Sequence, residues 1–192
     1  LAGRHRWNLL VEATAPAGAA DPAEPLGEAL AAAIAAGLVG AATIAASETQ
    51  AEDLWRLRES MSEAERIDGV AAKHDISVAV SHMADFMASA RAEVERRFAG
   101  ARVLAFGHLG DGNVHFNVRA PDGADDRAWL ASEGTAVTAL VHDLVTAAGG
   151  SISAEHGIGQ TKLAEFARLG GAARLAALRA IKSELDPHCI MH

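Results

Sequence analysis

Residues 106–118 read FGHLGDGNVHFNV and predict a β-hairpin that carries one histidine on each strand. Asp111-Gly112 marks its centre, because a two-residue type I′ turn needs φ > 0 at both central positions and favours this pair. With these two residues as the turn, His108 lies directly opposite His115. Opposed side chains on antiparallel strands are about 4.5–5.5 Å apart at Cβ. The hairpin therefore predicts two imidazoles close enough to form half of a metal site.

A third metal ligand is expected from SAEHGIGQTK, residues 153–162, where Glu155-His156 follows a short extended piece. The glycines after this pair let the backbone approach closely, at the mouth of a helix whose N-terminus favours negative charge. Two histidines and a glutamate with an open position are a recognised arrangement for catalytic Zn²⁺. On local sequence alone, a helix-capping role for Glu155 stays equally open. The stretch lacks the GxxxxGK[ST] spacing, which excludes a nucleotide phosphate loop.

Predicted strands and helices alternate along the chain. Strands are expected at 7–14, 42–46 and 75–80 and in the hairpin at 102–119, and helices at 25–36, 47–66, 83–98, 127–148, 160–169 and 172–185. The SETQ sequence at 47–50 has the capping-box pattern, so a helix should begin there and turn Leu54, Leu57 and Met61 inward. This order predicts an α+β fold with a largely antiparallel sheet flanked by helices.

Composition narrows the class of protein. The 17 basic and 25 acidic residues give a net charge of -8 without a basic run, which argues against nucleic acid as a partner. The single cysteine, Cys189, excludes an internal disulfide framework and fits a reducing compartment. The uncharged stretch 29–47 consists mostly of Ala and Gly, too weakly apolar for a transmembrane segment. We expect a cytoplasmic protein, with a peripheral place at the inner membrane left open for the full-length form. Because the sequence begins with Leu, we expect a piece of a longer chain.

Five stretches carry a resemblance to a known family: GHLGDGNVHFNV (107–118), SAEHGIGQTK (153–162), LWRLRESMSEA (54–64), KHDISVAVS (73–81) and LDPHCIM (185–191). In combination they resemble the C-terminal domain of FAD-linked oxidases, in the vanillyl-alcohol oxidase superfamily. The resemblance spans Trp7 to Met191. It implies a ferredoxin-like cap domain over residues 1–192, with 157–192 as a helical C-terminal segment. It also implies a separate N-terminal FAD-binding domain, which this chain lacks.

The resemblance assigns roles residue by residue. His108, His115 and Glu155 match ligands of a divalent metal, usually Zn²⁺, and His156 matches the base that takes the substrate hydroxyl proton. Contacts with the substrate are matched by Arg58, Ser62, Lys73 and Asn117. Arg58 and Ser62 are four residues apart and should share one helix face. Asn117 should lie on the histidine face of the hairpin, because side chains alternate along a strand.

The activity implied by the resemblance is flavin-dependent oxidation of a D-2-hydroxy acid to the 2-oxo acid, with hydride passing to FAD. The substrate could be of the D-lactate, D-2-hydroxyglutarate or glycolate type, because Val70, Ala72 and Ala79 depart from the pattern usual in the family. The electron acceptor is not indicated. By itself the chain should bind no FAD and show no dehydrogenase activity. Two alternatives stay open: a metal-dependent hydrolase, although HExxH is absent, and a stand-alone module that binds metal or small molecules.

Overall fold

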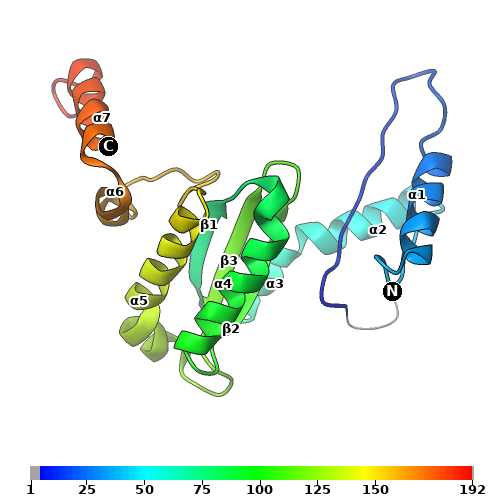
Figure 1. Ribbon diagram of the computed structural model, residues 1–192, viewed down its shortest axis with the longest axis horizontal. Coiled ribbons are helices and arrows are strands. Elements are labelled where there is room, and N and C mark those ends of the chain that lie inside the picture. The colour runs from blue at the N-terminus through cyan, green and yellow to red at the C-terminus, as the bar shows by residue number, and fades with distance from the viewer. Residues whose placement is uncertain (1–4, 192) are drawn as a thin grey trace. The chain divides into compact units, whose positions relative to one another are not determined.

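The computed structural model describes residues 5–191, which form two compact units (Figure 1). The first unit ends at Asp68 and the second begins at Gly69. The described residues of the first form the helices α1 (Ala23–Ala35), α2 (Glu48–Glu59) and α3 (Met61–Ile67). None of the helices in the described part of the chain is long and apolar enough to cross a membrane.

The capping motif begins α2 as predicted. The Ser47 hydroxyl accepts a hydrogen bond from the Gln50 backbone N–H at 3.3 Å. The prediction of one helix to residue 66 was wrong, because α2 ends before Ser60 and α3 begins after it. The Ser60 hydroxyl donates to the carbonyl of Leu57 at 3.1 Å, a back-bond that bends helices. Leu57, predicted to face inward, is 68% exposed.

Two strands predicted in the first unit were wrong. The segments 7–14 and 42–46 form no ladder with any described residue, and every side chain from 7 to 14 is exposed. Their residues favour extended backbone, but a strand also needs a partner to accept and donate its hydrogen bonds. Strand propensity alone therefore predicted more strands than the sheet contains.

The second unit contains an antiparallel sheet in the order β1-β3-β2, which confirms the predicted α+β class. Its strands are β1 (Ala72–Ser77), β2 (Arg102–His108) and β3 (Asn113–Arg119). Ser151 adds a single antiparallel bridge to Ser77. The chain order of strand, helix, two strands, helix and this bridging segment is the βαββαβ order of ferredoxin-like folds.

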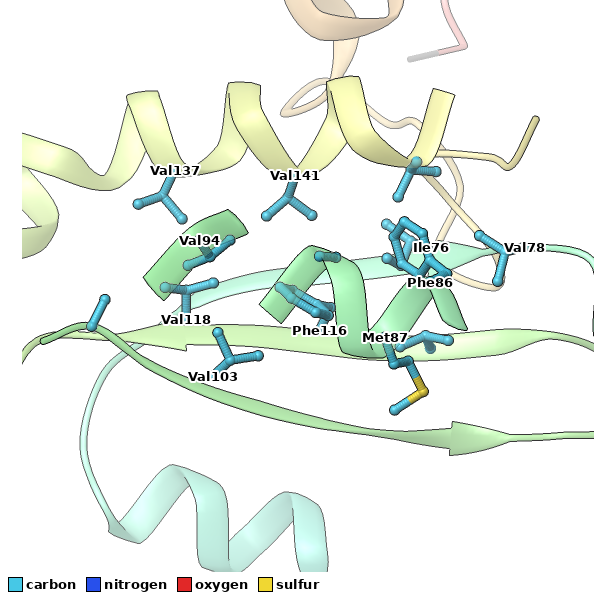
Figure 2. Close-up of a cluster of buried hydrophobic side chains, with 14 of the residues drawn as sticks. Ile76, Val78, Phe86, Met87, Val94, Val103, Phe116, Val118, Val137 and Val141 are labelled. Atoms are coloured by element: carbon cyan, nitrogen blue, oxygen red, sulfur yellow. The ribbon is translucent and has the colours of Figure 1, made fainter. Parts of the chain in front are cut away.

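Helices α4 (Met83–Arg97) and α5 (Asp126–Ala147) pack on one face of this sheet. Figure 2 shows Val137 and Val141 of α5 pointing toward Phe116 and Val118 of β3. All four side chains are fully buried, as the alternation of a strand with one apolar face requires. After α5 come α6 (Leu163–Leu169) and α7 (Ala172–Leu185). A 3₁₀ turn at Val80–His82 precedes α4.

The helices predicted at 83–98, 127–148 and 172–185 agree with α4, α5 and α7 to within one residue at each end. The helix predicted to begin at 160 begins at Leu163. The strand predicted at 75–80 lies three residues earlier in the chain, because its pairing with β3 ends at Ser77. The chain then turns into the 3₁₀ segment.

The predicted two-residue turn of the hairpin was wrong. His108 pairs with Asn113, so the loop contains the four residues Leu109–Gly112, and His115 pairs with Phe106. The Asp111 carboxylate accepts the Asn113 N–H at 2.9 Å, and the Gly112 carbonyl accepts the Val78 N–H at 3.1 Å. These bonds hold the wider loop open. The register is shifted by two residues, so each side chain keeps its predicted face.

Gly112 adopts φ +73°, and a Cβ there would lie 2.0 Å from the Val78 carbonyl oxygen. Gly112→Ala should lower the free energy of unfolding for two reasons. An alanine in the left-handed region costs roughly 1–2 kcal/mol, and the clash of its Cβ costs about 1–3 kcal/mol more. Gly123→Ala is the matched control, because Gly123 has φ +79° with open space around it. Equal losses in urea unfolding for the two variants would contradict this tight approach.

His74 is buried on the helix-covered face of β1. Its Nδ1 lies 2.7 Å from the Phe116 carbonyl oxygen, and its Nε2 lies 3.2 Å from the Thr138 hydroxyl. The carbonyl oxygen can only accept, so Nδ1–H donates to it, and in the neutral imidazole Nε2 then accepts from the hydroxyl. Burial lowers the pKa of His74 from 6.5 to about 4.

Between these two pKa values the unfolded chain binds a proton on His74 that the folded protein does not. Acidification from pH 7 to pH 4 should therefore destabilise the fold through His74 by about 3 kcal/mol. His74→Gln should be less stable at pH 7 but should lose less on acidification, as measured by urea unfolding across this range. Burial also lowers the pKa of His142, but His142 is present in both proteins and titrates in both. An unchanged pH dependence in the variant would rule out this role of His74.

Candidate functional site

The sheet face opposite α4 and α5 carries polar side chains and is called the polar face below. It consists of Lys73, Asp75 and Ser77 on β1, Asn113, His115 and Asn117 on β3, and Leu104, Phe106 and His108 on β2. The same alternation that buries Val114, Phe116 and Val118 under the helices places these residues on the other side. Core and polar face therefore follow from one register.

The two hairpin histidines share the polar face, as predicted. They are diagonal neighbours, since His115 is paired with Phe106 and His108 follows two residues later on β2. The rings of Phe106 and His115 are 5.1 Å apart at their centroids. His115 is half-buried and His108 is exposed. The expectation that these histidines oppose each other directly was wrong by two residues.

The loop after α5 brings Glu155 and His156 to this face. Backbone bonds between Ser77 and Ser151, at 3.0 and 2.8 Å, return the chain to the edge of β1. Glu155 Oε1 then lies 3.7 Å from His108 Nδ1, and the His156 ring centroid lies 6.0 Å from that of His115. Glu155 and His156 are exposed. Four residues from the two predicted motifs thus meet on one accessible surface.

Two groups of described residues have candidate ligand atoms within 4.8 Å of one another. One contains His108, Asp111 and Glu155, and the other contains Asp75, Glu155 and His156. Asp111, which the hairpin prediction treated only as a turn residue, therefore joins His108 and Glu155, whereas the predicted ligand His115 belongs to neither group. Imidazole and carboxylate donors together suit divalent ions such as Zn²⁺.

Asp75 is a residue of this site that the sequence interpretation missed. Its Oδ2 accepts the backbone N–H groups of Glu155 at 3.1 Å and His156 at 2.8 Å. Its Oδ1 accepts a hydrogen bond from Nδ2 of Asn113 at 3.2 Å. Burial opposes ionisation, but the N–H groups of His156 and Glu155, together with the charges of His156 and Lys162, hold the pKa of Asp75 below its usual value. The carboxylate therefore joins the loop to the hairpin.

Lys162 closes the base of the same loop. Its ammonium donates to the Ile152 carbonyl at 3.0 Å and lies 4.0 Å from Asp75 Oδ2. Burial lowers the pKa of Lys162, and the charge of Asp75 opposes that shift. The GIGQTK stretch thus uses its lysine to bind its own backbone and a buried carboxylate.

The residues matched to substrate contacts fall into both units. Lys73 and Asn117 are directly paired across β1 and β3 on the polar face, where Lys73 is exposed and Asn117 is buried. Arg58 lies in the last turn of α2 and Ser62 in the first turn of α3. The expectation of one helix through both was wrong, because the helix is interrupted between them at Ser60.

A signal for Asp75 was present in the sequence. HDISV places a carboxylate at the first residue of a predicted strand, between a histidine and an isoleucine. Charged residues are almost never fully buried unless they are paired. Strand alternation assigns Asp75 to the face opposite Ile76, but its partners are the backbone N–H groups of residues 80 and 81 positions later. Those partners carry no side-chain signature.

Comparison with known proteins identifies a family of domains that this chain matches. The whole chain, residues 1–192, matches the family described as FAD linked oxidases, C-terminal domain. It is 39% identical over 156 residues to D-2-hydroxyglutarate dehydrogenase of Xanthomonas citri pv. viticola. This match covers 81% of this chain and 33% of that protein. The D-2-hydroxyglutarate dehydrogenase of Stutzerimonas stutzeri is 36% identical over 76% of this chain and 31% of its own length.

A mitochondrial D-2-hydroxyglutarate dehydrogenase of Bos taurus is 33% identical over 96% of this chain and 32% of that protein. The chain therefore spans about a third of the length of the curated relatives it matches.

Proposed function

The chain belongs to the FAD linked oxidases as their C-terminal domain, and from this premise we propose that it carries the substrate and metal site of a flavin-dependent 2-hydroxy acid dehydrogenase. The observation that supports this most is the meeting of the His108–His115 hairpin and the Glu155-His156 loop on one accessible face. The names of the relatives favour D-2-hydroxyglutarate among the D-2-hydroxy acids. The product would be the 2-oxo acid.

His108, His115 and Glu155 would hold a divalent metal, for which Zn²⁺ is our proposal. The 3.7 Å between His108 Nδ1 and Glu155 Oε1 suits two ligands of one ion. Ligands 2.0–2.2 Å from a tetrahedral zinc lie about 3.4 Å from each other. Asp111, within 4.8 Å of both groups, provides a further carboxylate at the same place. A bound metal supplies a Lewis acid for the hydroxyl and carboxylate oxygens of a substrate.

His156 is the proposed base. Its side chain is 67% exposed, so a substrate can reach the ring. A neutral imidazole accepts the hydroxyl proton near neutral pH. FAD, which the N-terminal domain of the full-length protein would bind, would supply the hydride acceptor.

Cationic and polar groups would bind the substrate carboxylates. Arg58 can bind a carboxylate with two parallel hydrogen bonds, and Lys73 supplies a point charge. Ser62 and Asn117 add hydroxyl and amide donors. An anionic substrate is consistent with this set despite the net charge of -8.

The proposed reaction is tested by bleaching of the flavin in the full-length protein when D-2-hydroxyglutarate, D-lactate or glycolate is added under anaerobic conditions. We expect reduction of FAD by at least one of them, with D-2-hydroxyglutarate the most efficient. Absence of flavin, or a flavin that none of them reduces, would contradict the dehydrogenase. Metal-dependent hydrolysis without flavin would favour the hydrolase instead.

The proposed metal site is tested by zinc content and affinity of the full-length protein. His108→Ala or Glu155→Ala should weaken zinc binding more than about 100-fold, because loss of an outer partner alone costs 10–100-fold. His188→Ala, an exposed histidine outside the site, should leave the affinity unchanged. Wild-type affinity in His108→Ala and Glu155→Ala would exclude these ligands.

Arg58→Ala should mainly raise KM, because it removes a charge-assisted contact worth roughly 1.5–3 kcal/mol, or about 10- to 150-fold. Arg56→Ala is the matched control: it lies on the same helix, pairs with Asp53 and is 70% exposed. The two variants are compared by steady-state kinetics of the full-length enzyme. Equal KM values for Arg58→Ala and wild type would exclude Arg58 from the substrate contacts.

A further inference from the structure

We propose that Asp75 is a positioning residue, which holds the Glu155-His156 backbone against the hairpin and thereby sets the affinity of the site for its metal. What the loop binds rests on the proposed function. That Asp75 fixes the loop rests on the geometry alone.

The Asp75 carboxylate connects three segments that are distant in the sequence. It belongs to β1, accepts two consecutive N–H groups of the loop through Oδ2, and accepts the Asn113 side chain at the end of the hairpin through Oδ1. The Ser153 hydroxyl lies 3.4 Å from Oδ2 but donates its one proton to the Gly157 carbonyl at 2.8 Å. The Asp75 side chain is only 4% exposed, so water cannot readily replace these partners.

Main-chain pairing brings the loop to β1 but does not fix the functional residues. The ladder consists of the Ser77–Ser151 bridge and a weaker bond from Ala154 N–H to the Asp75 carbonyl at 3.3 Å. At Glu155 and His156 the N–H groups turn to the Asp75 side chain instead. Their backbone position therefore depends on a carboxylate and not on the sheet.

A carboxylate suits this place better than any neutral group. Its close hydrogen-bond partners are donors, namely two backbone N–H groups and an amide NH₂, and the His156 ring nitrogen Nδ1 lies 3.8 Å from Oδ2. An ionised carboxylate only accepts hydrogen bonds and can satisfy all of them. Lys162, 4.0 Å from Oδ2, adds a compensating charge and binds the Ile152 carbonyl at the start of the loop.

A small displacement of this loop matters because metal ligation tolerates little error. Glu155 can share an ion with His108 only while their donor atoms stay near the present 3.7 Å. Metal–ligand distances are fixed to a few tenths of an ångström. Loss of a group that orients a ligand typically weakens metal binding 10- to 100-fold.

The test compares Asp75→Ala and Asp75→Asn with wild type in the full-length protein. In metal-free protein, Asp75→Ala should speed amide hydrogen exchange in the peptide that covers residues 151–162, while peptides from α4 and α5 keep wild-type rates. In a zinc titration, its affinity should fall about 10- to 100-fold. Asp75→Asn keeps the shape and one acceptor oxygen, so both effects should be smaller.

The matched control is Asp186→Ala at the end of α7. Asp186 is also buried, also accepts two backbone N–H groups, from Ile190 and Met191, and also pairs with a lysine, Lys182. Its removal should speed exchange near the C-terminus and leave zinc affinity unchanged. If Asp75→Ala does not fold, Asp75→Val keeps a strand-favouring side chain without acceptors and replaces it.

Unchanged loop exchange in the folded variant without acceptors, exchange that rises equally in α4 and α5, or wild-type zinc affinity would each overturn the proposal. A wild-type protein that binds no zinc would overturn the proposed metal site. In that case the exchange experiment still decides whether Asp75 fixes the loop.

Discussion

The pairing of β3 with strands on both of its sides is the constraint on which the second unit depends. Because side chains alternate, one register places Val114, Phe116 and Val118 under α4 and α5. The same register places His115 and Asn117 on the polar face. A slip by one residue would bury the polar side chains and expose the core at the same time. Core packing and site geometry are therefore stabilised by the same hydrogen bonds.

Two adjacent residues of β1 make contacts on opposite faces of the sheet. His74 faces the helices and, as a neutral imidazole, binds the Phe116 carbonyl and the Thr138 hydroxyl of α5. Asp75 faces the other side and, as a carboxylate, binds the loop. The two neighbours thus have opposite ionisation requirements, because one has mixed neutral partners and the other has only donors. Consecutive residues of one strand tie the sheet to a helix and to the site.

The site combines parts of different stiffness. His108 and His115 lie on a hairpin whose opposite face is buried in the hydrophobic core. Glu155 and His156 come from a loop whose positions depend on a few polar contacts, with Gly157 in the left-handed region at φ +72°. Such loops carry binding residues because a rigid scaffold positions them while their own sequence stays free to vary. In this protein the scaffold is the edge of β1, and the contacts are hydrogen bonds to the Asp75 side chain and to the β1 backbone.

The sequence by itself determined the α+β class, the long helices, both ends of the hairpin and the face on which each hairpin residue lies. These follow from local signals such as the capping at Ser47 and from the fixed period of a strand. Only the tertiary structure decided the register of the turn, because Gly112 bonds to Val78, more than 30 residues earlier in the chain. It also decided that 7–14 and 42–46 form no ladder, since a strand needs a partner. The partners of Asp75 are backbone N–H groups, which every residue except proline has, so no sequence pattern could have identified them.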